Sequence, residues 1–158
     1  MLFQRINRND PEKIFIVVYN SYSTASLTNG QPVIWDYAAD ANGVSVTKPA
    51  DGTGRAGHYG SAIAGIACET IASGAYGLVQ VYGYHAAVRV RTWTGGAPAI
   101  AAGTALASLS AVFALESYPA SAAATSTLTL HNAQYCAFAL AAQASYTTKA
   151  IACFIKAL

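Results

Sequence analysis

IAGIACETIASGAYGLVQVYGYHAAVRV, residues 63–90, carries the clearest periodicity in the chain. Along residues 78–82, Leu, Gln and Tyr alternate with two valines, and a second alternating run follows Gly83. The second run puts Tyr84, Ala86, Val88 and Val90 on one face and His85, Ala87, Arg89 and Arg91 on the other. A period of two is typical of a half-buried β-strand, and Gly74 supplies a turn residue before it. The segment therefore predicts two or three short strands packed as hairpins.

Short strands are also predicted outward from this segment in both directions. The continuous apolar run IFIVVY at residues 14–19 predicts a buried strand. Further strands are expected at residues 31–37, 134–142 and 148–157. The rhythm of short strands and turn signals predicts an all-β fold, either a compact sandwich or a small barrel of short antiparallel strands.

The chain length and the distribution of charge predict one domain with two extended segments. Residues 1–13 hold five of the sixteen charged side chains and no periodic pattern, which indicates an N-terminal arm. Residues 14–158 are then a single β domain, because 158 residues are enough for one core without metals or disulfides. Residues 40–60 are rich in Gly and turn dipeptides, and predict a long surface loop that reaches a neighbouring molecule.

A weak internal similarity links two parts of the chain. IACETIASGAYGLVQV and FALAAQASYTTKAIACFI both consist of an Ala-rich strand, a turn of small residues and an apolar strand. This similarity indicates two related hairpins rather than a repeat protein.

Charge is scarce, and its scarcity is informative. Only 10% of the residues are charged, against about 25% in ordinary soluble domains. Within residues 92–158 only Glu116, Lys149 and Lys156 carry formal charge. Such a surface predicts that other subunits cover part of it, although a surface built from Ser, Thr, Ala and Tyr is the alternative. The net charge of +2 and the lack of a Lys/Arg run argue against nucleic acid as a partner.

Membrane association and export are not expected. Residues 97–115 are uncharged, but they are mostly Ala, Gly, Ser and Thr, which insert weakly into a bilayer. The first thirteen residues lack the apolar run of a signal peptide. Cys68, Cys136 and Cys153 lie among apolar neighbours and predict buried free thiols, with a Cys68–Cys153 bridge left open.

The residues that could carry chemistry match no known catalytic or metal pattern. His58, His85 and His131 belong to no metal-ligand motif, and the glycines near Arg55 lack the lysine of a phosphate loop. We therefore expect no enzymatic activity, no metal and no cofactor. A small hydrolase built from residues that converge only in space is an alternative.

Three segments of the chain resemble those of a known group of proteins. IAGIACETIASGAYGLVQVYGY, followed by IAAGTAL and a closing ALAAQASYTTKAIACFIKAL, resembles the head decoration (cement) proteins of tailed phages. The resemblance covers residues 57–158, and the first 56 residues match no pattern of that group.

The resemblance implies a structural role on a virion. It implies binding to the major capsid protein on the outer capsid surface, self-association as a homotrimer, and synthesis in the host cytoplasm. On this reading the arm, the loop and one strand face supply the interface residues, which are Arg5, Arg8, Arg55, His58, Tyr59, Arg89, Arg91 and Trp93. A second hypothesis is a carbohydrate-binding or adhesive module on a virion, which would use exposed aromatics such as Tyr59, Tyr76, Tyr84 and Trp93.

Overall fold

Nine β-strands and no helix make up the part of the chain that the structure describes. The computed structural model describes residues 12–49, 63–92, 99–108, 112–117, 135–144 and 146–157. The strands are β1 (Lys13–Asn20), β2 (Pro32–Trp35), β3 (Ser45–Thr47), β4 (Ile63–Ala67), β5 (Tyr76–Arg91), β6 (Ala105–Ala107), β7 (Leu115–Ser117), β8 (Ala137–Ala139) and β9 (Lys149–Lys156). The predicted all-β class is confirmed.

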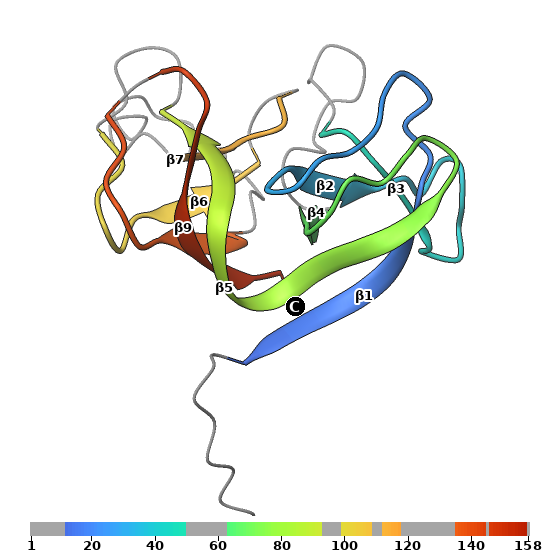
Figure 1. The fold of residues 1–158 in the computed structure, drawn as a ribbon, viewed down its shortest axis with the longest axis horizontal. Helices are drawn as coiled ribbons and strands as arrows, with labels where there is room; N and C mark the ends of the chain where they lie inside the picture. Colours follow the sequence, from blue (N-terminus) through green and yellow to red (C-terminus); the bar gives the residue numbers. More distant parts are fainter. Residues whose placement is uncertain are drawn as a thin grey trace, which may run out of the picture.

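The strands form two closed rings that share β5. Hydrogen-bonded neighbours follow the order β1-β3-β2-β4-β5, and a β1–β5 pairing closes this first ring. The second ring follows the order β5-β7-β6-β8-β9, and a β5–β9 pairing closes it. We call the first ring lobe 1 and the second lobe 2. Figure 1 shows β5 passing from one lobe into the other with a bend between them.

The two lobes have the same topology. In lobe 1, β1 pairs parallel with β3, and in lobe 2, β5 pairs parallel with β7. The remaining pairings in each ring are antiparallel and follow the same order. An isolated bridge between Leu27 and Ile71 in lobe 1 has its counterpart between Ile100 and Gln143 in lobe 2. The hairpin similarity seen in the sequence is thus part of a correspondence between two whole lobes.

The correspondence extends to single hydrogen bonds. The amide of Gly30 donates to the carbonyl of Ala67, and the amide of Gly103 donates to the carbonyl of Ala139, both at 2.8 Å. Both glycines have positive φ, +83° and +86°. Gly30 and Gly103 therefore hold the same position in the two lobes, as do Ala67 and Ala139.

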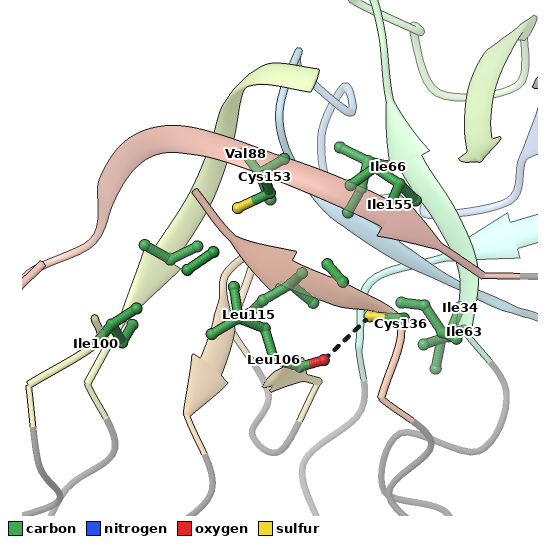
Figure 2. Close-up of a cluster of buried hydrophobic side chains, with 13 residues drawn as sticks. Ile34, Ile63, Ile66, Val88, Ile100, Leu106, Leu115, Cys136, Cys153 and Ile155 are labelled. Carbon is green, nitrogen blue, oxygen red and sulfur yellow. Dashed lines mark hydrogen bonds between the residues drawn. The ribbon is translucent and has the colours of Figure 1, made fainter. Parts of the chain in front are cut away.

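Each lobe has its own apolar core, and the larger core joins them. The lobe 1 core includes Val18, Leu27, Val33, Val46 and Val79. The lobe 2 core includes Val88, Ile100, Leu106, Leu115 and Cys153. It also includes Ile34, Ile63 and Ile66, which come from β2 and β4 of lobe 1. Figure 2 shows Ile34 and Ile63 beside Cys136, and Ile66 beside Ile155.

Several local expectations are corrected. The predicted antiparallel arrangement is broken by the two parallel pairs. Residues 63–90 were predicted to hold two or three short strands, and they hold two, β4 and β5, but β5 is long, with 16 residues. A register shift between His85 and Val88 also moves His85 to the buried side with Val88, although simple alternation put them on opposite faces. An extra residue in one strand of a pair has this effect.

The first strand and the long loop also differ from expectation. The strand at residues 14–19 exists but is not buried on both faces, since Ile14, Phe15 and Val17 are exposed. The predicted loop at residues 40–60 contains the short strand β3. Residues 1–11 and 50–62, which hold most of the predicted arm and loop, lie outside the described residues.

The described parts of residues 97–115 are a bridge residue, turns and the strand β6, with β7 beginning at Leu115. Among the described residues, no helix is long and apolar enough to cross a membrane.

Candidate interaction surfaces

Of the eight predicted interface residues, the structure describes Arg89 and Arg91. Arg5, Arg8, Arg55, His58, Tyr59 and Trp93 lie outside the described residues. Arg89 donates from Nη2 to the hydroxyl of Thr28 at 2.7 Å, and its backbone amide donates to the carbonyl of Gly30. This side chain therefore connects β5 of lobe 2 to the loop before β2 of lobe 1.

Arg91 takes part in a buried ion pair. Its Nε lies 2.6 Å from Oε1 of Glu116, whose side chain is fully buried, while 14% of the Arg91 side chain is exposed. The guanidinium also lies over the ring of Tyr146, 4.9 Å from its centroid. Because its guanidinium is engaged within lobe 2, Arg91 has a structural role that strand periodicity does not indicate.

The two most exposed of the large hydrophobic side chains described in lobe 1, Tyr76 and Val17, lie on the outer face of β5 and β1. Val17 and Leu78 are register partners, as are Tyr19 and Tyr76. Val17 is 63% exposed and Tyr76 is 68% exposed. The rings of Tyr19 and Tyr76 pack at 5.2 Å with a tilt of 59°. We call Val17, Tyr19, Tyr76 and Leu78 the lobe 1 band.

The band is exposed because of how β1 closes its ring. Along β1, Ile16 and Val18 point to the lobe 1 core, so Val17 and Tyr19 point outward. At the start of β1, a register shift lies between Ile14 and Phe15, and the side chains of Ile14 and Phe15 are both exposed. A strand of uninterrupted apolar residues thus provides both core and surface, and hydrophobicity alone does not distinguish the two.

A second exposed apolar face belongs to lobe 2. Tyr135 is 48% exposed, Phe138 39% and Leu140 48%. Phe138 is the register partner of Phe154 on β9, and the ring of Phe154 packs edge-on against Tyr82 at 5.2 Å. Cross-strand aromatic pairs of this kind stabilise a sheet. We call Tyr135, Phe138, Leu140 and Phe154 the lobe 2 face.

The cysteines show no feature of a reactive site. All three are free, with Cys136 and Cys153 buried and Cys68 half-buried, so the bridge left open in the sequence does not form. Burial raises the pKa of Cys136 and of Cys153 to about 12, and it also raises the pKa of Cys68. Thiols held in this state are poor nucleophiles.

The other groups that could carry chemistry are possible metal ligands and the carboxylate of Asp40. Within these residues no three His, Cys, Asp or Glu side chains lie close enough to hold a metal ion. The pKa of Asp40 is lowered because its carboxylate accepts backbone hydrogen bonds from Asn42, Val44 and Ser45. The carboxylate therefore stabilises this loop.

The aromatic residues named for the carbohydrate hypothesis are only partly described. Tyr76 is exposed, and Tyr84 is half-buried with Lys13 over its ring at 5.9 Å. Tyr59 and Trp93 lie outside the described residues. Tyr76 packs on Tyr19 at an interplanar angle of 59°, so the two rings do not form one flat surface.

No family model and no curated protein matches this chain. The surfaces themselves are therefore the guide to function.

Proposed function

We propose that the chain is a structural virion protein that binds the outer surface of a phage capsid and stabilises it. The observation that carries the proposal is the lobe 1 band, in which four large side chains occupy adjacent positions on regular strands. Large exposed apolar patches on a rigid scaffold are typical of protein interaction sites. The sequence resemblance to head decoration proteins supplies the partner, the major capsid protein.

The chemistry of the band fits a protein partner. Val17, Leu78 and the two tyrosines offer apolar area without a carboxylate or a basic side chain, and Tyr is enriched at interface hot spots. Two closed rings also leave few free strand edges for non-specific pairing. A capsid offers many identical sites, and a modest contact at each site gains avidity when several copies of the chain bind as one assembly.

The test is sedimentation of the purified full-length chain with phage heads that lack it. The double variant Val17→Lys/Leu78→Glu replaces the centre of the band with an opposite-charge cross-strand pair that the sheet tolerates. We expect the variant to keep its circular dichroism spectrum and to bind heads at least tenfold more weakly. Val44→Lys, at an exposed apolar position outside the band, is the matched control and should bind normally.

Two outcomes contradict the proposal at different levels. If the native chain does not sediment with heads, the shell-binding function is wrong. If the native chain and the double variant bind equally, the band is not the contact surface.

The alternative function is a carbohydrate-binding or adhesive module on a virion. Of the aromatic residues named for it, the structure describes Tyr76 and Tyr84, and of these two only Tyr76 is exposed. Binding of the native chain to a glycan array, lost in Tyr76→Ala, would favour it.

A further inference from the structure

The outer face of β4 in lobe 1 is an interface inside the chain. Ile63 and Ile66 lie in the same buried cluster as Cys136 and Ile155 of lobe 2. Their neighbours Ala64 and Ala67 belong instead to the lobe 1 core. One face of β4 therefore fills lobe 1, and the other is covered by lobe 2 (Figure 2).

No described residue covers the corresponding face of lobe 2 in the way that lobe 2 covers β4. Ile66 pairs with Pro32 and Gln80, and Phe138 pairs with Ala105 and Phe154, so Phe138 holds in lobe 2 the position of Ile66. Tyr135 precedes Phe138 by the same interval that separates Ile63 from Ile66. Ile63 and Ile66 are buried, whereas Tyr135 and Phe138 are exposed.

The surface of lobe 2 that covers Ile66 also has a counterpart in lobe 1. Ile66 lies in the same buried cluster as Ile155 of lobe 2, and Ile155 pairs with Gly83 of β5. This pair marks the end of the lobe 2 ring at which the second half of β5 begins. In lobe 1, β1 holds the place of this half of β5, because both close their ring and both pair parallel with a short strand. The matching end of lobe 1 is therefore the start of β1, where Ile14 and Phe15 are exposed.

We propose that the lobe 2 face binds the start of β1 in a second copy of this chain. The contact repeats between two molecules the packing that joins lobe 1 to lobe 2 within one molecule. It pairs two unlike surfaces, so it is heterologous, and copies joined this way close into a ring if the rotation between them allows it. The contact concerns self-association, and it can fail while binding to capsids through the lobe 1 band stands.

The first experiment measures the mass of the purified full-length chain by size-exclusion chromatography with light scattering across a range of concentrations. We expect an oligomer whose dissociation constant rises at least tenfold in Phe138→Lys. Phe15→Lys is expected to have the same effect, although it lies on the other lobe. Val44→Lys, with the same 39% exposure as Phe138, is the control and should leave the mass unchanged. Circular dichroism checks that each variant is folded.

The second experiment tests which surfaces meet. Phe15→Cys and Phe138→Cys are prepared separately in a Cys68→Ser background, mixed, and oxidised gently. A covalent dimer that forms only in the mixture supports the head-to-tail contact. A dimer formed by Phe138→Cys alone would show the lobe 2 face packing on itself and would overturn the proposal.

A native chain that stays monomeric at all concentrations also overturns it, and indicates that another part of the chain or a different partner covers the lobe 2 face. Measuring head binding of Phe138→Lys in parallel keeps the two proposals separate, since shell binding through the lobe 1 band does not require Phe138.

Discussion

At the scale of single residues, Gly30 and Gly103 hold the same position in the two lobes but have different surroundings. Both have positive φ and both amides donate to a strand of their own lobe. A Cβ at Gly30 would lie 2.0 Å from the carbonyl oxygen of Ala87, whereas a Cβ at Gly103 would meet nothing within 4 Å. Gly30 thus allows lobe 1 to touch β5 closely, in addition to forming its turn.

The two glycines therefore predict unequal costs for the same substitution. Gly103→Ala should lower the free energy of unfolding by about 1–2 kcal/mol, the penalty of a left-handed conformation for an L-residue. Gly30→Ala adds a backbone collision and should cost roughly 3 kcal/mol or more. Urea unfolding of the two variants measures both values, and equal costs would contradict the close approach at Gly30.

Arg89 and Arg91 provide a second comparison of neighbouring positions. Arg91→Ala leaves the carboxylate of Glu116 buried without this partner, and we expect it to lower the free energy of unfolding by about 3–5 kcal/mol. Arg89→Ala removes a hydrogen bond to a hydroxyl and should cost about 1 kcal/mol. Thermal and urea unfolding of the two variants test the order, and a larger cost for Arg89→Ala would contradict it.

At the scale of elements, β5 is the strand on which both lobes depend. It bends between the lobes at Gly83, where φ is +101° and a Cβ would lie 1.9 Å from the carbonyl oxygen of Glu12. The buried amide of Gln80 donates to the carbonyls of Tyr82 and Tyr84 at this bend. His85 follows, and its Nδ1 accepts the amide of Ala87 at 3.1 Å across the register shift. Side chains thus satisfy backbone groups where the ladder is irregular.

The position of His85 predicts a pH dependence of stability. Burial lowers the pKa of His85 below its ordinary value of 6.5, and Lys13 lowers it further. The unfolded chain therefore binds a proton before the folded chain does as the pH falls. The contribution of His85 is complete above pH 6.5 and decreases as the pH falls from there toward the lowered pKa.

Urea unfolding between pH 7.5 and pH 5 measures this effect. We expect His85→Gln to reduce the loss of stability below pH 6.5 relative to the native chain. His58→Gln is the control for a histidine elsewhere in the chain, and an unchanged pH profile in His85→Gln would contradict the assignment.

At the scale of the whole molecule, the shared strand and the shared core couple the two lobes. Ile34, Ile63 and Ile66 of lobe 1 are buried in the lobe 2 cluster, and Phe113, just before β7, packs on the lobe 1 core. Lys48, just after β3, also lies over the ring of Phe113 at 5.4 Å. Neither lobe can unfold without exposing apolar surface of the other.

We therefore expect one cooperative unfolding transition. Leu27→Ala in lobe 1 and Leu115→Ala in lobe 2 each remove a fully buried side chain and should cost about 2–5 kcal/mol. Both should lower the same calorimetric midpoint, with the van't Hoff and calorimetric enthalpies in agreement. Two separate transitions, each sensitive to one of the variants, would show that the lobes unfold independently.

Local periodicity was enough to predict the strand class and many of the inward positions. Alternation identified Ile151, Cys153 and Ile155 as one face of a strand, and two of the three are fully buried. It also detected the similarity between the β4–β5 and β8–β9 hairpins, because strand and turn signals are local properties of the chain.

Which apolar residues lie at the surface depends on the tertiary fold. Val17 and Val18 are the same residue type at adjacent positions, yet one is exposed and the other fully buried. Phe138 and Ile66 hold corresponding positions, yet only Ile66 is covered by a neighbouring lobe. Ring closure, parallel pairing and register shifts depend on contacts between residues far apart in the sequence, and periodicity within one strand carries no information about them.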